Sequence, residues 1–497
     1  LDTQGEVAGY EADILNAIGI ELGIEIEYVQ VTRHNAEDML LSGQVDVLIG
    51  QQPRARNREA QFDFSAPYYV NQERMVVKTE APYTSLTDFV GLPVSVEIGS
   101  RSEHALRHWS DQRGITLDVR TYLSESEALD ALANGEVQGM LGELASLRRA
   151  GRQQMRLIDE PVLDEYYAMV VRRWDANLLN LLNRSLQRLK ASGRLDEIFK
   201  QWFPDESIDF TTLVPVYDLL YEDTRQLTDF PADIPYPANP IRARIDSGQP
   251  LRVAGIITTE TDSPAQVRMI NTFNQALVEE MARRWGVQAQ YVPGSILNPV
   301  DMVVGGQADL AVGVGPRWDG ADRVEYSQPY LTHGDRLMIP ANKQINTFAD
   351  LLGTDWIIGY FADDAPDAEH IKKFAEIFGV GQNIREPFAI QRESDAIFTM
   401  TTELNIDMIY GDSLRLLALQ REYDQPDSVK ILDKPYGDDM PVAFAGPRND
   451  ADFRDLINAT LQDMVRDGTY QRLWTERFGT GTPITIPVWP AVSPDQP

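Results

Sequence analysis

Hydrophobic and polar residues follow each other along this chain in a regular order of amphipathic helix, turn glycine and apolar strand. Residues 9–22 carry apolar side chains at helical spacing, and Gly23 is placed to end that helix. The alternating segment 24–29 then predicts a half-buried strand, and the continuous apolar run 45–50 predicts a strand covered on both faces. A second helix is expected between them, at about 34–42. This rhythm is typical of α/β domains.

The same rhythm continues up to residue 204. Strands are predicted at RMVVK, VSVEIGS, VQGMLGE and YYAMVV, and helices near 101–113, 125–134 and 175–192 and at RLDEIFKQWF. One lobe is interrupted by a second lobe and then resumes. Two strands must therefore cross between the lobes, which predicts a hinge.

The whole pattern occurs twice. LLSGQVDVLIG and FDFSAPYY in the first half have the counterparts VVGGQADLAVG and VEYSQPYL in the second. Asp46 corresponds to Asp309 and Ser65 to Ser327, so the register stays at 263 or 262 residues. Agreement of spacing, turn glycines and apolar pattern predicts one architecture built twice, as copy one and copy two.

The predicted fold is α/β, with two tandem bilobed domains whose sheets are mixed, mostly parallel and covered by helices on both faces. Domain 1 is expected at 1–204, with an inserted lobe at about 74–166, and domain 2 at 250–480, with an inserted lobe at about 337–441. A linker rich in Pro and Asp is expected between them, at 205–249, and a Pro-rich tail at 481–497.

The two copies differ at their beginnings. Copy two opens with the strand LRVAGII at 251–257, whereas copy one has only LDTQGEVAG before its first helix. By register, the equivalent strand of copy one lies before residue 1, or another segment supplies it. The segments TTLVPVY of the linker and TPITIPV of the tail are the weaker alternatives.

Composition excludes several classes of function. A net charge of -31 argues against nucleic acid and anionic membrane surfaces as partners. The absence of cysteine excludes disulfides and thiolate chemistry, and five scattered histidines predict no metal site. No apolar run is long enough to span a membrane, so no direct membrane insertion is expected, and the first residues do not read as a signal peptide. No GxSxG, Walker or HExxH motif occurs, so an enzyme is not expected.

The motifs GYEADIL, LLSGQVDVLIG, FDFSAPYY, SLTDFVG, LANGEVQGMLGE and GRLDEIFKQWF are individually weak. In this order and spacing, repeated in one chain, they resemble the family 3 extracellular solute-binding proteins, which bind polar amino acids for ABC importers. The resemblance covers residues 1–204 and about 250–480. It implies two Venus-flytrap domains of the type II periplasmic-binding-protein fold, with no cofactor.

The resemblance also implies a ligand site in copy one. An arginine of the first lobe grips the ligand carboxylate, an acidic residue of the second lobe holds its ammonium, and a helix N-terminus adds backbone N–H groups. The matching positions are Arg58 for the carboxylate and Glu143 for the ammonium, where the family usually has Asp. The helix start is formed by Gly99, Ser100 and Arg101. Arg33 stands where an aromatic side chain commonly stacks, Gln51 stands where a hydroxyl is usual, and Glu97 is expected to face the cleft.

Copy two departs from this pattern. Its acidic position is Asp412, but Gly320 or Ala321 stands where the carboxylate arginine belongs. Arg317, which like Arg54 follows a proline, is the alternative carboxylate ligand. The helix-start segment FADDAPD would repel a carboxylate. Copy two is therefore expected to bind something else, such as a cation or amine, or to have lost binding.

The expected function is capture of an amino acid or similar small polar solute outside the cytoplasm, in the periplasm or extracellularly, by closure of two lobes. The partner would be a membrane permease of the ABC type, with the protein tethered to the membrane in full length. The alternative is the sensory ectodomain of a membrane receptor, because tandem copies of this fold also precede transmembrane signalling modules.

Overall fold

Two structural units divide the chain. Unit 1 comprises residues 1–214 and 489–497, and unit 2 comprises residues 215–488. The computed structural model describes residues 7–32, 34–150, 154–204, 206–214, 217, 240–258, 265–294, 297–361, 365–384, 393–402, 406–433, 439–479 and 484–489.

Among the described residues of unit 1, helices and strands alternate over 93–167, whereas three helices come before the first strand and three follow the last. The helices are α1 (Tyr10–Leu22), α2 (Ala36–Leu41), α3 (Arg56–Glu59), α4 (Arg101–Gln112), α5 (Glu125–Asn134), α6 (Leu144–Ala150), α7 (Ala176–Ala191), α8 (Arg194–Trp202) and α9 (Phe210–Leu213). The strands are β1 (Phe62–Phe64), β2 (Tyr69–Lys78), β3 (Pro93–Glu97), β4 (Asp118–Tyr122), β5 (Gly139–Glu143), β6 (Met155–Tyr167) and β7 (Val170–Arg172).

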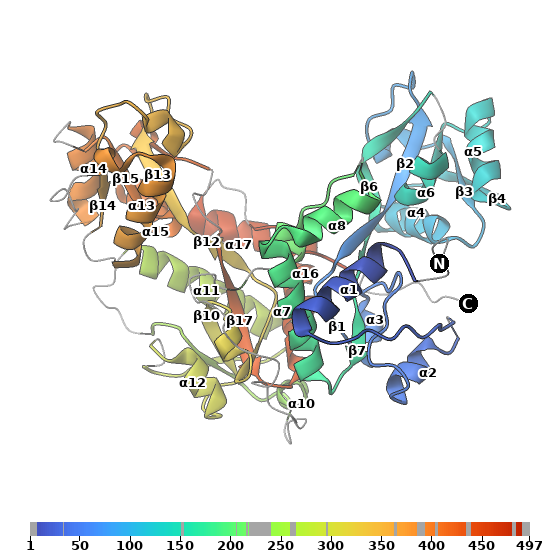
Figure 1. Ribbon diagram of the computed structural model, residues 1–497, viewed down its shortest axis with the longest axis horizontal. Helices are drawn as coiled ribbons and strands as arrows, with labels where there is room; N and C mark the ends of the chain where they lie inside the picture. Colours follow the sequence, from blue (N-terminus) through green and yellow to red (C-terminus); the bar gives the residue numbers. More distant parts are fainter. Residues whose placement is uncertain are drawn as a thin grey trace. The chain divides into compact units, whose positions relative to one another are not determined.

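Two lobes make up unit 1. In the first lobe, α1 packs against α7 and α8, and β1 pairs with β7 (Figure 1). The second lobe is built on one sheet with the strand order β4-β3-β5-β2-β6. The long antiparallel pair β2 and β6 links the lobes, because Tyr69 lies in the core of the first lobe and Val77 in that of the second.

The face on which a side chain lies in the second lobe follows from the alternation along β2. Met75 and Val77 pack with α4, whereas Val76 packs with α5 on the opposite face. The sheet is mixed, because the strands joined through helices run parallel and the returning strands β2 and β6 run antiparallel. Polar residues on the α4 face at the ends of β2, β5 and β6 lie near the junction of the lobes.

Unit 2 repeats this architecture. Its helices are α10 (Ile241–Asp246), α11 (Ala265–Arg284), α12 (Pro299–Val304), α13 (Ala365–Phe378), α14 (Glu393–Thr401), α15 (Ser413–Glu422), α16 (Ala451–Arg466) and α17 (Thr469–Phe478). Its strands are β8 (Leu251–Ala254), β9 (Ala289–Tyr291), β10 (Leu310–Val314), β11 (Val324–Tyr326), β12 (Leu331–His333), β13 (Asp335–Pro340), β14 (Ile358–Tyr360), β15 (Met408–Asp412), β16 (Val429–Ile431) and β17 (Met440–Pro447).

The sheets of unit 2 follow the orders β11-β17-β10-β8-β9 and β14-β15-β13-β16. Hydrogen bonds confirm the register of the duplication. The Ser65 N–H donates to the Met169 carbonyl at 2.9 Å, and the Ser65 hydroxyl accepts the Met169 N–H at 3.0 Å. Ser327 makes the same two bonds with Phe444, at 2.9 and 3.0 Å. The two copies therefore fold alike at equivalent residues.

The strands predicted at 24–29 and 45–50 are wrong. In unit 2, β8 lies between β9 and β10 and pairs in parallel with both. In unit 1, segment 24–29 forms no ladder and segment 45–50 makes only one bridge, from Leu48 to Val170. The two alternative segments do not form strands in their described residues. The linker segment TTLVPVY begins within helix α9, and residues 484–488 of the tail segment TPITIPV are coil.

The missing neighbour explains this difference. The carboxylate of Asp309 accepts the backbone N–H of Arg252 from β8 at 2.9 Å, and its side chain is 1% exposed. Among the described residues of unit 1, no such strand lies beside the equivalent Asp46, which is 78% exposed. Because each of the two segments needs a strand between them for its ladder, 24–29 forms no ladder and 45–50 keeps only the bridge from Leu48 to Val170.

A peptide with the β8 sequence LRVAGII is expected to stabilise unit 1 by filling this position. At a free concentration tenfold above its Kd, binding to the folded state would add about 1.4 kcal/mol and raise the unfolding temperature by about 4 °C. Thermal unfolding of the chain with and without the peptide measures this. A peptide LRPAGII is the control, since its proline lacks an N–H for the ladder. Equal shifts with both peptides would contradict the explanation.

Candidate functional site

Arg58 lies on the short helix α3 of the first lobe. Its guanidinium donates to the Pro53 carbonyl at 3.0 Å, to the Gln52 side chain at 3.0 Å and to the Glu37 carboxylate at 3.1 Å. Burial lowers the pKa of Arg58 from its ordinary value, and the charge of Glu37 opposes this. The Arg58 side chain is only 17% exposed, whereas Glu37 is 47% exposed. The guanidinium is thus held in place by three contacts within the first lobe.

Gln51 lies in the loop before α3 in a left-handed conformation, with φ of 51°. Its backbone N–H donates to the Glu11 carboxylate at 2.7 Å, and the Tyr68 hydroxyl donates to the same oxygen at 2.6 Å. The carboxylate of α1 therefore fixes the loop that carries Gln51 against the buried start of β2. The neighbouring Arg54 is a buried structural residue, bonded to Glu59 at 3.2 Å.

The helix start expected from sequence is formed by α4 in the second lobe. Ser100 is its N-cap, and the Ser100 hydroxyl accepts the Glu103 N–H at 3.2 Å. The Gly99 N–H donates to the Glu103 carboxylate at 2.8 Å. Arg101 forms an ion pair with Glu165 of β6. The positive end of the α4 dipole and the guanidinium therefore lie together at this edge of the sheet.

Glu97 is the last residue of β3, and its carboxylate accepts the backbone N–H of Glu125 at 3.1 Å. The residue thus binds the first residue of α5 within the same lobe. Two further expectations lie outside the described residues: Arg33, and the pair Asp363 and Asp364 of FADDAPD.

Glu143 ends β5 and belongs to a group of carboxylates. It lies directly opposite Glu73 of β2, so the two side chains share the face of the sheet that packs with α4. Glu165 lies on the same face, opposite Asn71. The Ser102 hydroxyl of α4 donates to Glu73 at 2.5 Å. Three glutamates thus surround the N-terminus of α4, and Arg101 is paired with one of them.

Burial of these carboxylates changes their protonation. Burial raises the pKa of Glu73 from 4.5 to about 7, against the hydrogen bond from Ser102, and the charges of Glu165 and Glu143 add to the rise. Burial likewise raises the pKa of Glu165, although Arg101 opposes it. Both side chains are less than a tenth exposed. Near neutral pH, a raised pKa of about 7 favours the protonated form of Glu73 more than in an exposed glutamate.

Glu73→Gln is expected to stabilise unit 1 at alkaline pH. Since the folded state holds the Glu73 proton more tightly than the unfolded chain, stability falls as pH rises between 4.5 and about 7. The lost stability amounts to roughly 3 kcal/mol above that window. Unfolding by denaturant at pH 4.5 and pH 8 should show the gain in Glu73→Gln mainly at pH 8. The exposed Glu80→Gln is the control, and an equal gain at both pH values would contradict the assignment.

Asp412, the acidic residue expected in unit 2, ends β15 as Glu143 ends β5 in unit 1. Asp412 caps α15, accepting the Leu414 N–H at 2.9 Å, and its other oxygen bonds the Nδ1 of His333 at 2.6 Å. Asp412 lies opposite Asp335 of β13. Arg317 forms an ion pair with Asp319 at 2.5 Å. The structure thus brings Asp412 and Asp335 together and holds Arg317 within its own loop.

Gly320 is the residue equivalent to Arg58 when equivalent positions of the two copies are taken to lie 262 residues apart. A side chain there would collide with the hydroxyl of Tyr326, since even an added Cβ overlaps it. Unit 2 therefore has no room for an arginine at residue 320 without movement of Tyr326.

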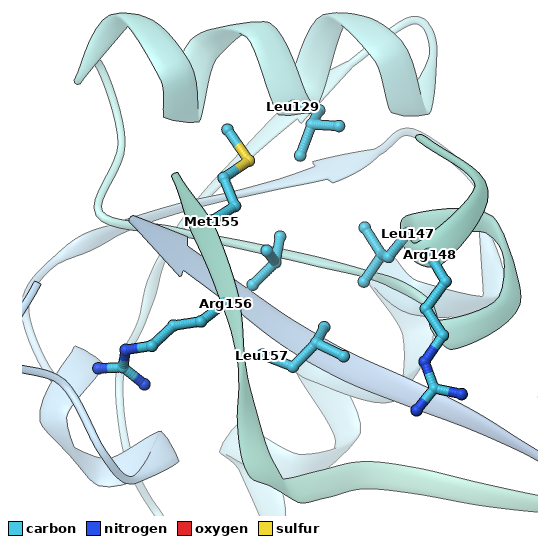
Figure 2. Close-up of a pocket in the computed structure, with 7 residues that line it drawn as sticks. Leu129, Leu147, Arg148, Met155, Arg156 and Leu157 are labelled. Atoms are coloured by element: carbon cyan, nitrogen blue, oxygen red, sulfur yellow. The ribbon is translucent and has the colours of Figure 1, made fainter. Parts of the chain in front are cut away.

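A cavity of about 310 Å³ lies in the second lobe of unit 1, away from these residues. It is lined by Val76, Leu129, Leu147, Arg148, Met155, Arg156 and Leu157. Figure 2 shows that the two guanidinium groups extend away from the apolar side chains. Val76 lies on the face opposite Glu73, so this apolar space is separated by the sheet from the charged site.

The sequence analysis missed Glu73, Glu165, Asn71, His333 and Asp335. A signal was present, because Glu73 and Asp335 are acidic residues at equivalent positions of the two copies, 262 residues apart. Among the described residues, no group of His, Cys, Asp or Glu is arranged to hold a metal ion. Within the same residues, no helix is long and apolar enough to cross a membrane.

Comparison with known proteins agrees with this architecture. The curated relatives include the ABC transporter glutamine-binding protein GlnH of Bacillus subtilis, 27% identical over 41% of this chain and 76% of that protein. They also include the ABC transporter arginine-binding protein 1 of Escherichia coli, 26% identical over 41% of this chain and 85% of that protein.

Solved structures of similar chains include an ancestral arginine-binding protein bound to arginine, with 29% identity over 41% of this chain and 91% of that one, at a TM-score of 0.32. Substrate-binding domain 2 of Lactococcus lactis GlnP, in an open conformation, has 21% identity over 41% of this chain and 90% of that one, at a TM-score of 0.36.

The family model for bacterial extracellular solute-binding proteins, family 3, matches residues 1–205 and 268–480, which together are most of the chain and include both copies. Together with the sheets of the two units, this match gives the chain the fold of tandem type II periplasmic binding proteins. The chain belongs to the bacterial extracellular solute-binding proteins of family 3.

Proposed function

We propose that unit 1 captures an amino acid between its lobes and presents it to an ABC importer. The ligand carboxylate binds Arg58 of the first lobe, and the ligand ammonium binds Glu143 of the second. A zwitterion loses most of its water in a closed site, so each of its charges needs a fixed counter-charge. The observation that carries the proposal is this placement of opposite charges on the two lobes of a family 3 domain.

The electrostatics of the two lobes support this division of roles. In the first lobe, the ion pair of Arg58 with the half-exposed Glu37 is of the kind that contributes little to stability, so a ligand carboxylate can displace it. In the second lobe, the carboxylate group of Glu73, Glu143 and Glu165 outnumbers Arg101 and attracts a cation. The N-terminus of α4 and Arg101 lie at the same edge and suit the ligand carboxylate.

The antiparallel pair β2 and β6 suits a hinge, because both strands continue from one lobe into the other. Closure about them would bring Arg58 and Glu143 to opposite ends of one small solute. The closed form would then be the state that a membrane permease recognises.

We propose that unit 2 has altered or lost this binding. Asp412 remains as an ammonium acceptor, but Gly320 leaves no arginine for a carboxylate and Arg317 is paired with Asp319. The contact of Asp412 with the imidazole of His333 can balance the charge of this carboxylate.

Calorimetric titration of the chain tests this function. The panel contains proteinogenic amino acids and L-cystine, because relatives are named as binding glutamine, arginine and L-cystine. We expect saturable binding of at least one amino acid, with one site per chain. Absence of binding by every member would reject the proposal.

A further inference from the structure

A pair of carboxylates stands at the same place in both units. Glu73 lies opposite Glu143 in unit 1, and Asp335 lies opposite Asp412 in unit 2. Directly opposite residues on antiparallel strands lie side by side on one face. Each second lobe therefore places two carboxyl groups side by side at the junction with its first lobe, and a cation beside them would favour their ionised forms.

In unit 2 the chain supplies that cation. His333 bonds Asp412 through Nδ1 at 2.6 Å, and Asp335 and Asp439 add negative charge around the ring. Burial acts to lower the pKa of His333, but the hydrogen bond and charge of Asp412 outweigh it, and the pKa is raised. A protonated imidazole is thus favoured beside the carboxylate that the family uses for a ligand ammonium.

In unit 1 the equivalent residue is Asn71, which carries no charge. The register of Ser65 and Ser327 places residue 71 at residue 333. Asn71 is 2% exposed, and its Nδ2 donates to the Tyr167 hydroxyl at 3.0 Å. Its Oδ1 is buried and accepts no hydrogen bond from the described residues.

Three carboxyl groups and one guanidinium surround Asn71. Glu73, Glu143 and Glu165 face this position from β2, β5 and β6, and Arg101 faces it from α4. Arg101 is paired with Glu165. The buried acceptor Oδ1 and the pair of Glu73 and Glu143 therefore form a place for a group that both donates hydrogen bonds and carries positive charge.

We propose that residues 71 and 333 decide where each carboxylate pair obtains its cation: Asn71 leaves the pair of unit 1 to the ammonium of a ligand, and His333 fills the pair of unit 2 from within. This inference rests on the proposed function of unit 1. It explains why unit 2 keeps Asp412 yet does not present it to an amino acid, since a second cation would have to displace the imidazolium.

Exchange of the two residues tests the inference in the full chain. Asn71→His is expected to weaken binding of L-arginine and L-glutamine at least roughly 30-fold at pH 6, where the imidazole is charged, and much less at pH 9, where it is neutral. Asn71→Gln, which adds size without charge, is the matched control and should show no such dependence on pH. Calorimetry at both pH values gives the affinities.

Proton titrations by NMR test the inference without any ligand. His333, and the imidazole of Asn71→His, should each titrate above the ordinary pKa of about 6.5 for histidine, and Asp412→Asn should return His333 toward it. A His333 that titrates normally in the unaltered chain would overturn the inference, as would unchanged affinity in Asn71→His while its imidazole is charged.

If neither L-arginine nor L-glutamine binds the unaltered chain but other amino acids of the panel do, the one that binds best replaces them as probe. If no amino acid of the panel binds, the proposed function is rejected. If His333 has an ordinary pKa, only the inference about residues 71 and 333 is rejected.

Discussion

Arg58→Gln is expected to weaken amino-acid binding by unit 1 at least roughly 100-fold. The substitution removes the planar, charged donor that fits a carboxylate and leaves that carboxylate unpaired in a closed site, which costs about 3 kcal/mol or more. Calorimetric titration with the best ligand of the panel measures the loss. Arg58→Lys keeps the charge but not the two parallel donors, so a smaller loss is expected.

Arg56→Gln is the matched control, because Arg56 lies on the same short helix. It should leave the affinity nearly unchanged. Unfolding curves must show that both variants are folded, since Arg58 also bonds Glu37 and the Pro53 carbonyl. An affinity of folded Arg58→Gln within about threefold of the unaltered chain would exclude Arg58 as the carboxylate ligand.

Glu143→Gln is expected to have an effect of similar size, roughly 100-fold, because the ligand ammonium would lose its nearest fixed charge. Glu143→Asp should retain most of the affinity, since it keeps the carboxylate. The exposed Glu136→Gln in the same lobe serves as control. If Glu143→Gln bound as the control does, while Glu73→Gln lost binding, the ammonium site would have to be moved to Glu73.

The sequence predicted most of the architecture because its signals are local. The pattern located α1, α5 and α7, and Gly23 ends α1 in the left-handed conformation, as sequence analysis expects. The duplication was visible because turn glycines and strand patterns are repeated in register. The errors at 24–29 and 45–50 came from a non-local cause, since a strand forms only beside a partner.

The carboxylate group was harder to predict for the same reason. Arg58 and Glu143 could be placed by their spacing from motifs. The importance of Glu73 depends on its position opposite Glu143 and on the hydroxyl of Ser102, which come from strand register and helix packing. His333 likewise gains its role only through contact with Asp412, residues that are far apart in the sequence.

The most direct test of the account compares one amino acid with two derivatives that each lack one charge. The best ligand of the panel, its N-acetyl derivative and its primary amide are titrated into the unaltered chain. The account predicts that only the zwitterion binds well, with both derivatives weaker by roughly 100-fold, because each leaves Glu143 or Arg58 without its counter-charge. Equal binding of the zwitterion and either derivative would contradict it.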